Sequence, residues 1–269
     1  MGDLIDRKNK KMKLVLYQMN IVWEDKESNY ILLENMLTNY GKRIDLLLLP
    51  EMCFTGFSMD VEKTKECNSE TIDKISGLAK KFHTAIGFGW VKDRGEKSEN
   101  HYTVIDRKGK VIFDYVKIHP FSFSGENIKF QGGEEINFFQ LDDIIFSSFI
   151  CYDLRFPEIF QIASKKAHVI LVPANWPQKR REHWNCLLQA RAIENQVYII
   201  AVNCVGEIGG VTYSGDSCVI NPNGEILLRM PKQEGILEYD LSDDVDNFRD
   251  SFQVKCDRRE SLYHKINFS

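Results

Sequence analysis

Residues 147–158 read SSFICYDLRFPE and join two kinds of sequence pattern. The apolar run at 144–150 is typical of a buried strand, and it leads directly into Cys151. Helical apolar spacing follows at 156–166. A strand that turns into a helix in this way holds the side chain at the turn above the edge of the sheet. The stretch therefore predicts an α/β fold with Cys151 displayed at a strand end.

The same alternation of strand and helix patterns recurs along the chain. Short apolar runs between polar turns predict further buried strands at 13–18, 45–49, 85–91, 168–172 and 197–202. Helical spacing predicts further helices at 28–40, 71–82 and 182–195. Hairpin patterns predict antiparallel pairs at 102–107 with 110–115 and at 216–220 with 225–229. We therefore expect a mixed sheet.

The composition favours one globular domain. Of the 269 residues, 43% are apolar and 12% are aromatic, which suffices to bury a sizeable core. No Pro-, Gly- or Ser-rich linker divides the sequence. We expect a single domain over 1–269, with a flexible start at 1–12 and a C-terminal tail at 241–269. The net charge of −4 and the lack of a basic block argue against nucleic acid as a partner.

The seven cysteines indicate the cellular compartment. Their number is odd and they form no CxxC pair, which is typical of a reducing compartment, so we expect a cytoplasmic protein. The apolar run near the N-terminus is too short for a signal peptide, and no run approaches the ~20 residues of a membrane helix. His183 and Cys186 have a ligand-like gap but no further partners, and no glycine-rich phosphate loop follows the early strands. We expect no metal, no cofactor, no nucleotide and no membrane partner.

Two charged residues follow apolar runs in the manner of Cys151. Glu51 comes directly after the run DLLLLP, and Lys117 comes directly after the run at 111–116. Each of the three residues alone is typical of something simpler, a buried structural cysteine or the first charge of a solvated loop. Together at one sheet edge they would supply a base, a cation and a nucleophile, which acyl transfer from an amide requires. The backbone N–H of Tyr152 would face the developing oxyanion.

Three segments carry a family resemblance. PEMCFTGFSM at 50–59, DYVKIHPF at 114–121 and FICYDLRFPE at 149–158 resemble the signature segments of the nitrilase, or carbon-nitrogen hydrolase, superfamily. The resemblance extends over residues 13–263, with the segments in matching order and spacing. It implies a four-layer αββα sandwich, in which two mixed sheets pack face to face and helices cover both outer faces.

The resemblance also implies roles for individual residues. Glu51 takes the thiol proton and later activates water, and Cys151 attacks the carbonyl carbon to form a thioester and release ammonia. Lys117 and the N–H of Tyr152 steady the oxyanion. Glu126, nine residues after Lys117, matches a second glutamate of the superfamily and would orient the lysine. Its alternative is a solvated loop acid.

Residues around the expected pocket follow from the same resemblance. Asn175 and Trp176 match pocket walls, although Trp176 is equally typical of an ordinary loop contact. We expect Asp153 and Arg155 to pair and to brace the turn around the nucleophile. Cys53 lies close to Glu51 in the sequence, and we assign it to packing in the core.

Within the superfamily, the chain is most similar to bacterial enzymes of the ω-amidase type. Those enzymes cleave monoamides of dicarboxylic acids, 2-oxoglutaramate and 2-oxosuccinamate. The carboxylate of such a substrate needs a cationic anchor. Lys179, Arg180 and Arg181 are candidates, and their alternative is a solvated charge run. The predicted partners are therefore a small amide and water.

The resemblance to the superfamily also implies a homodimer, with contacts through residues 156–166 and 246–263.

Several alternative functions share the same sequence features. The same catalytic residues serve enzymes that cleave a nitrile, an N-carbamoyl amine or deaminated glutathione, because the triad does not fix the acyl group. A catalytically silent binding or scaffold protein of the same fold is a further alternative, against which the intact triad argues.

Overall fold

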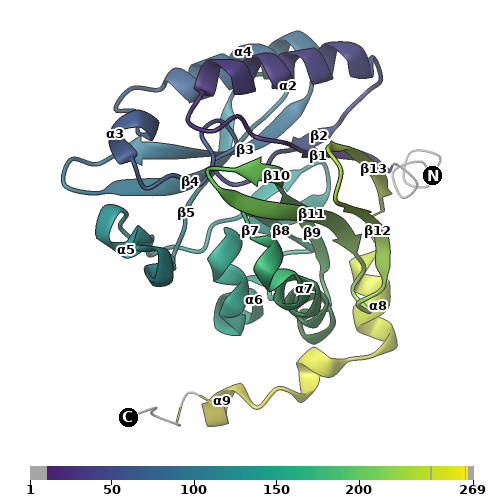
Figure 1. The fold of residues 1–269 in the computed structure, drawn as a ribbon. Coiled ribbons are helices and arrows are strands. Elements are labelled where there is room, and N and C mark those ends of the chain that lie inside the picture. Colours follow the sequence, from purple (N-terminus) through teal and green to yellow (C-terminus); the bar gives the residue numbers. More distant parts are fainter. Residues whose placement is uncertain (1–10, 243, 264, 266–269) are drawn as a thin grey trace.

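The computed structural model describes residues 11–242, 244–263 and 265. Two β-sheets pack face to face, and helices cover both outer faces, which is the predicted αββα arrangement (Figure 1). The covering helices are α2 (Lys26–Tyr40) and α4 (Glu70–Phe82) on one side, and α6 (Pro157–Ala163) and α7 (Arg181–Asn195) on the other. None of the described helices is both long and apolar enough to cross a membrane.

The first sheet has a parallel centre and antiparallel edges. Its order is β13 (Gly235–Leu241), β1 (Met12–Gln18), β2 (Leu46–Leu48), β3 (Ala85–Asp93), β4 (Ser98–Ile105) and β5 (Val111–Val116). β1, β2 and β3 run parallel, and the other pairs are antiparallel. Met12 of β1 pairs with Leu241 of β13. Of the start expected to be flexible, residues 1–10 lie outside the described residues, whereas Met12 already belongs to the sheet.

The second sheet repeats this plan. Its order is β10 (Val205–Ile208), β11 (Val211–Ile220), β9 (Tyr198–Asn203), β8 (Val169–Ala174), β7 (Ile144–Ser148) and β6 (Phe139–Leu141), and β12 (Ile226–Pro231) also pairs with β11. β7, β8 and β9 run parallel. Because the ends of parallel strands meet at the same edge of a sheet, the segments that follow β7 and β8 open beside each other.

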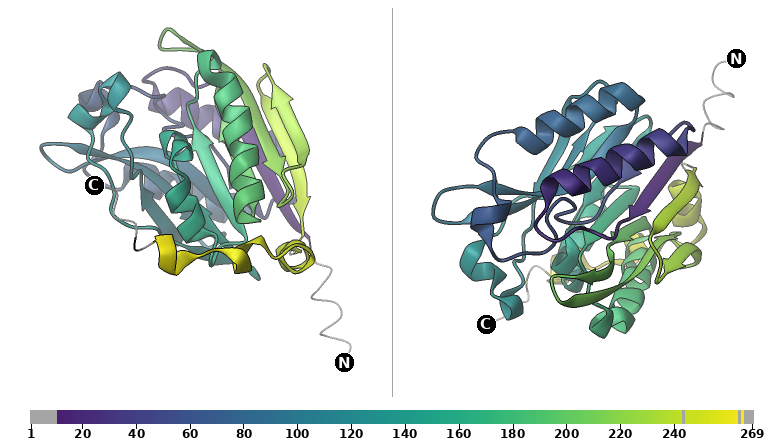
Figure 2. Two further views of the ribbon diagram at one scale, coloured as in Figure 1. Left: turned by 90° about the horizontal axis from the view of Figure 1, so that it is seen from below. Right: turned by 45° about the horizontal axis from the view of Figure 1, so that its top comes forward.

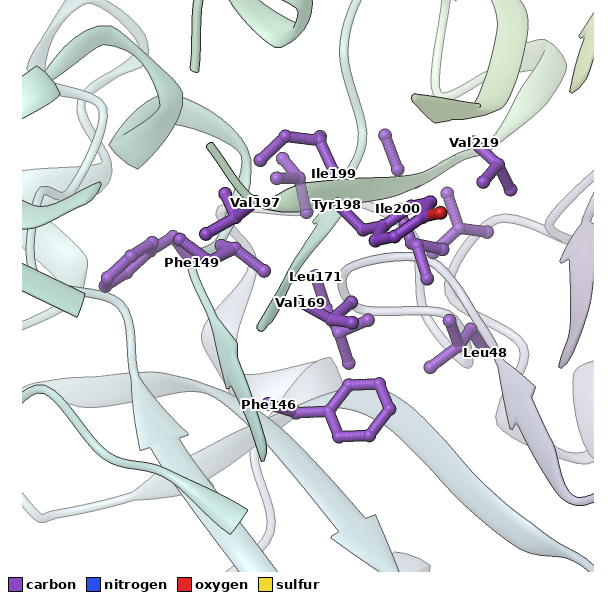
Figure 3. Close-up of a cluster of buried hydrophobic side chains, with 14 of the residues drawn as sticks. Leu48, Phe146, Phe149, Val169, Leu171, Val197, Tyr198, Ile199, Ile200 and Val219 are labelled. Atoms are coloured by element: carbon purple, nitrogen blue, oxygen red, sulfur yellow. The ribbon is translucent and has the colours of Figure 1, made fainter. Parts of the chain in front are cut away.

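The hydrophobic core fills the space between the sheets and the space under the helices. Leu14 belongs to the cluster between the sheets, whereas its neighbour Val15 belongs to the cluster beneath α2 and α4. Successive side chains of a strand point to opposite faces, so a strand covered on both faces is apolar almost throughout. Figure 3 shows the cluster between the sheets, where Leu48 of β2 packs with Phe146 of β7.

Every strand and helix predicted from the sequence is present, with boundaries that differ by a few residues. The strand expected at 144–150 ends at Ser148, and the 3₁₀ helix η2 (Cys151–Arg155) separates it from α6. The strands β6, β10 and β13 are additions to the prediction. Short helices also add to it: α3 (Val61–Thr64), η1 (Ser122–Ser124), α5 (Glu126–Lys129) and η3 (Gln178–Arg180).

The described part of the C-terminal tail crosses the lower side of the molecule, beside α6 and α7 (Figure 2). It contains α8 (Val245–Ser251), η4 (Val254–Asp257) and α9 (Glu260–Tyr263). Arg249 donates a hydrogen bond to the carbonyl oxygen of Ser164, just after α6. Lys255 Nζ lies 2.5 Å from the same oxygen. The tail is therefore fastened to the end of α6.

Candidate active site

Glu51, Lys117 and Cys151 meet at one edge of the two sheets. Glu51 follows β2, Lys117 follows β5, and Cys151 follows β7. The Nζ atom of Lys117 lies 2.9 Å from Oε1 of Glu51, and both side chains are buried. The Cys151 side chain is 8% exposed, and the charges of Glu51 and Lys117 both act on its thiol. Three residues predicted from separate strand ends are therefore in one place.

A second glutamate contacts the same lysine. Lys117 Nζ lies 2.9 Å from Oε2 and 3.1 Å from Oε1 of Glu126, which is buried at the start of α5. Burial raises the pKa of Glu126, although Lys117 opposes the shift. Burial alone would lower the pKa of Lys117, but Glu126 and Glu51 outweigh it and the pKa is raised. Lys117 is thus an ammonium between two carboxylates, and Glu126 is not a solvated loop acid.

Two asparagines hold the Glu51 side chain in one orientation. The Nδ2 atom of Asn100, in β4, donates to Oε1 of Glu51 at 2.8 Å and to Oε1 of Glu126 at 3.1 Å. The backbone N–H of Asn175 donates to the other oxygen of Glu51 at 2.8 Å. Both carboxylate oxygens are therefore bonded. The sequence prediction missed Asn100, because nothing distinguishes it from its neighbours in the polar run SENH.

The backbone turns sharply at Cys151. Its φ angle is 47°, in the left-handed region that residues other than glycine rarely adopt, whereas Ile150 before it is extended. Burial raises the pKa of the Cys151 thiol well above its ordinary value, and the charge of Glu51 adds to the shift while Lys117 opposes it. The resting site therefore holds a thiol, which needs a base before it can react as a thiolate.

Asp153 ties the turn after β7 to the segment that carries Lys117. Its Oδ2 atom accepts from the backbone N–H of Ile150 at 3.0 Å and from the hydroxyl of Tyr115 at 2.8 Å. Its Oδ1 atom accepts from the backbone N–H of His119 at 2.9 Å and lies 2.7 Å from the His119 Nδ1 atom. Because Tyr115 and His119 flank Lys117 in the chain, Asp153 sets the spacing between Lys117 and Cys151.

A cavity of about 210 Å³ opens onto Cys151. Pockets that take drug-sized ligands measure roughly 300–1,000 Å³, so this one suits a smaller molecule. Six of the fourteen lining residues are aromatic, and charged and polar side chains lie among them. The lining residues are Phe57, Lys117, Phe121, Phe123, Ser124, Cys151, Tyr152, Arg155, Asn175, Trp176, Pro177, Arg180, Val211 and Tyr213. Within the described ranges, no group of side chains is suited to holding a metal ion.

The residues predicted to bind substrate take two different places. Asn175, Trp176 and Arg180 line the cavity. Arg181 is not part of the lining, and its guanidinium is engaged with the buried carboxylate of Asp216, at 2.6 Å and 2.7 Å. The structure thus gives Arg181 a partner inside the protein and leaves Arg180 facing the cavity.

The prediction that Arg155 pairs with Asp153 is wrong. The four hydrogen bonds and contacts described above already occupy both oxygens of Asp153. The guanidinium of Arg155 instead lies 4.9 Å from the ring centroid of Trp176, and one of its nitrogens lies 3.2 Å from Nδ1 of His183. Arg155 therefore belongs to the cavity lining. This place is not visible in the sequence, because Trp176 and His183 come from later segments of the chain.

Comparison with known proteins places this geometry in a family. The sequence model of the family described as carbon-nitrogen hydrolase matches residues 13–250. The chain belongs to the carbon-nitrogen hydrolase family. This membership confirms the resemblance found in the three sequence segments, and with it the expected fold.

Individual relatives agree with this assignment. The chain is 34% identical to the 2-oxoglutaramate amidase of Bacillus subtilis (strain 168), over 91% of this chain and 97% of that protein. It is 33% identical to omega-amidase YafV of Escherichia coli (strain K12), over 80% and 84% of the two chains. The crystal structure of XC1258 from Xanthomonas campestris, a CN-hydrolase superfamily protein, matches with a TM-score of 0.87 and 28% identity, over 92% and 97%. This carbon-nitrogen hydrolase is thus a hydrolase of carbon–nitrogen bonds in amides.

Proposed function

We propose that this carbon-nitrogen hydrolase releases ammonia from a small linear amide. Cys151 is the nucleophile, Glu51 is the general base, and Lys117 stabilises the oxyanion. The observation that carries the proposal is the contact between Lys117 and Glu51 beside a buried thiol, at a cavity suited to a small molecule. Acyl transfer from an amide needs these three chemical functions side by side.

In the proposed acylation, Glu51 accepts the thiol proton while the sulfur of Cys151 attacks the amide carbon. The carbonyl oxygen becomes an oxyanion, which the Lys117 ammonium and the N–H of Tyr152 stabilise. The carbon–nitrogen bond breaks as Glu51 passes the proton to the leaving nitrogen, so ammonia departs and a thioester remains.

In the proposed deacylation, Glu51 takes a proton from a water molecule, and the resulting hydroxide attacks the thioester carbon. The carbon–sulfur bond breaks, the acid is released, and Glu51 returns the proton to the sulfur of Cys151. We assign positioning roles to Glu126, which keeps Lys117 charged, and to Asn100, which bridges the two glutamates. The raised pKa of the thiol supports the need for a base in acylation.

We propose monoamides of dicarboxylic acids, 2-oxoglutaramate and 2-oxosuccinamate, as the substrates. The relatives named 2-oxoglutaramate amidase and omega-amidase support this choice. The small cavity supports it too, because two arginines, Arg155 and Arg180, lie in its lining and suit an anionic group.

The test is ammonia release from 2-oxoglutaramate, glutamine, an aliphatic nitrile and an N-carbamoyl amine. We expect strong release from 2-oxoglutaramate by the wild type, and a loss of at least about 10³-fold in Cys151→Ala and in Glu51→Gln. Lys117→Ala should slow the acylation step in single-turnover measurements. Thermal melting of each variant serves as the control for folding.

Each result that differs from these expectations would overturn a different part of the proposal. Turnover of another compound but not of 2-oxoglutaramate would move the function to another branch of the family. Silence on all four compounds would favour a binding or scaffold protein. Near-normal turnover by Cys151→Ala would remove Cys151 from its assigned role.

We further propose that the enzyme acts in the cytoplasm as a homodimer. All seven cysteines are free, as expected in a reducing compartment. Ile162 on α6 and Ile193 on α7 are each more than half exposed and offer apolar area for contact between two copies. Sedimentation velocity would distinguish a dimer from a monomer, and cell fractionation would test the compartment.

A further inference from the structure

Arg155 and Arg180 come from different segments and line the same cavity as Cys151. Arg155 ends η2, and Arg180 ends η3. Both side chains are half-buried, yet in the part of the chain that the structure describes neither has a carboxylate partner. A guanidinium offers five N–H donors. One Arg155 nitrogen lies 3.2 Å from Nδ1 of His183, and no other side-chain acceptor contacts either guanidinium among the described residues.

Other buried or partly buried arginines of the protein have partners within it. Arg181 and Arg229 both contact Asp216, Arg191 donates to the carbonyl oxygen of Leu154, and Arg249 donates to backbone carbonyls near α6. Pairing of this kind is the usual condition for a cation that leaves water. The cavity is therefore the place where two guanidinium groups are partly desolvated without a carboxylate partner among the described residues.

Aromatic side chains hold the two guanidinium groups in place. The Arg155 guanidinium lies 4.9 Å from the ring centroid of Trp176 and 5.9 Å from that of Tyr152. The Arg180 guanidinium lies 5.2 Å from the ring centroid of Phe121, and its backbone oxygen accepts a hydrogen bond from the Trp176 indole at 2.7 Å. Stacking on an aromatic face leaves the edge of a guanidinium, which carries its N–H groups, open to a ligand.

The two like charges are also close enough to affect each other. Burial lowers the pKa of Arg155, and the charge of Arg180 lowers it further. An anion that bound between them would remove this repulsion and satisfy the open donors. Because bidentate hydrogen bonds to a carboxylate match the guanidinium fork, a carboxylate is the anion that this pair fits best.

The deep end of the cavity has the opposite character. Its cation, Lys117, is already shared by the carboxylates of Glu51 and Glu126, and all three side chains are almost completely buried. A substrate carboxylate has no free cation to bind there. A molecule with an amide at one end and a carboxylate at the other is therefore oriented with its amide toward Cys151.

We propose that Arg155 and Arg180 form a carboxylate-binding subsite, which selects acyl chains that end in a carboxylate and directs their amide to Cys151. This inference rests on the proposed amidase function and adds the physical basis of its substrate class. It also replaces Arg181 by Arg155 as a partner of Arg180 in substrate recognition.

The test compares two amides of nearly equal size, succinamate, which ends in a carboxylate, and butyramide, which ends in a methyl group. We expect the wild type to prefer succinamate in kcat/KM. In Arg155→Gln and in Arg180→Gln the ratio of kcat/KM for succinamate to that for butyramide should fall about 10- to 100-fold, mainly through KM, since a hydrogen bond to a charged group is lost. Lys179, the third anchor candidate from the sequence, is exposed and lies outside the cavity lining. Lys179→Gln therefore serves as the control and should keep the wild-type ratio.

The outcomes separate this inference from the function on which it rests. If the wild type releases ammonia from neither of these amides and not from 2-oxoglutaramate, the amidase proposal itself is wrong. A wild type that turns over both amides equally would overturn the subsite alone. An unchanged kcat/KM ratio in both arginine variants would also overturn the subsite. Each ratio compares two substrates of the same variant, so a general loss of active protein does not change it.

Discussion

The thiol of Cys151 lies among charges that oppose its ionisation. Glu51 is a carboxylate beside it, and Lys117, the cation of the site, is shared with Glu126. The two largest causes that raise the pKa of the thiol are burial and the charge of Glu51, and the charge of Glu126 adds to them. The same carboxylate that serves as base in the proposed mechanism also keeps the resting thiol protonated.

Replacement of Glu51 should separate these two effects. In Glu51→Gln one negative charge is gone while Lys117 remains, so the pKa of Cys151 should fall. Alkylation of Cys151 by iodoacetamide near pH 8 should then be about tenfold faster, although amide turnover is lost. Peptide mass analysis across a pH series measures this, with the exposed Cys67 in the same sample as the control. If the pH midpoint of Cys151 alkylation in Glu51→Gln equals or exceeds that of the wild type, the assigned effect of Glu51 is wrong.

Residues that end an apolar run could be predicted from the sequence, and residues that act across segments could not. Glu51, Lys117 and Cys151 each follow such a run, which marks them as strand-end residues. Asn100 has no such mark, because it acts on Glu51, 49 positions away, through the pairing of strands in the first sheet. The sequence predicts a pair of Arg155 with Asp153 because the two opposite charges are neighbours in the chain. A cavity that Arg155 shares with residues of other segments is not visible in the sequence.

At the scale of elements, β3 sets the position of Glu51 by close contact. A Cβ atom added to Gly89 would collide with the backbone of Glu51 and Met52. The backbone N–H of Cys53 donates to the carbonyl oxygen of Gly89 at 3.2 Å, which keeps the two segments together. The absence of a side chain at this one position of β3 therefore allows the segment after β2 to approach.

Gly89→Ala should displace the Glu51 segment. We expect a loss of about 1–3 kcal/mol in the free energy of unfolding. We also expect at least about a tenfold loss in kcat, because a small misplacement of the proposed base is costly. Gly77→Ala is the matched control, since a Cβ atom there meets nothing within 4 Å and the residue lies inside α4. That variant should gain about 0.5–1 kcal/mol and keep full activity. Urea unfolding measures the stability of the two variants, and amide turnover measures their activity. Equal stability and activity of Gly89→Ala and Gly77→Ala would refute the importance of the close contact at Gly89.

Local apolar patterns in the sequence predict most of the helices and strands, because the spacing of apolar residues indicates whether one or both faces of an element are buried. β13 could not be placed in this way, since it pairs with β1, and Leu241 and its partner Met12 lie 229 positions apart in the chain. The end of β7 was placed two residues late, because Phe149 and Ile150 are buried and apolar without belonging to the strand. Burial continues past the last ladder hydrogen bond, and hydrophobicity alone does not show where pairing stops.

At the scale of the whole molecule, the C-terminal tail carries a titratable group into its contact with α6. Burial lowers the pKa of Lys255 to about 7, and the charges of Arg249 and Arg258 add to the shift. In the unfolded chain the same group keeps its ordinary pKa of about 10.4. Between these two values the unfolded state binds more protons than the folded state.

The stability of the wild type should therefore rise with pH between about 7 and 10. The free energy of unfolding increases with pH wherever the unfolded state binds more protons. In Lys255→Met this contribution is absent, so the difference between the two proteins should change across that window by about 1–2 kcal/mol, a figure reduced for the solvent that still reaches the side chain. Denaturant unfolding at several pH values measures it. A difference that does not vary with pH would show that Lys255 titrates normally in the folded protein.

The shared ammonium at the deep end of the cavity also bears on how the catalytic cycle finishes. Hydrolysis turns the neutral amide end of the proposed substrate into a second carboxylate, beside Glu51 and Glu126, whose single cation, Lys117, is already engaged. The dicarboxylate product is therefore repelled where the amide was accepted, although its far end still fits the arginines. Under the proposed mechanism the enzyme therefore makes its own product a poor ligand, and product accumulation should do little to slow turnover.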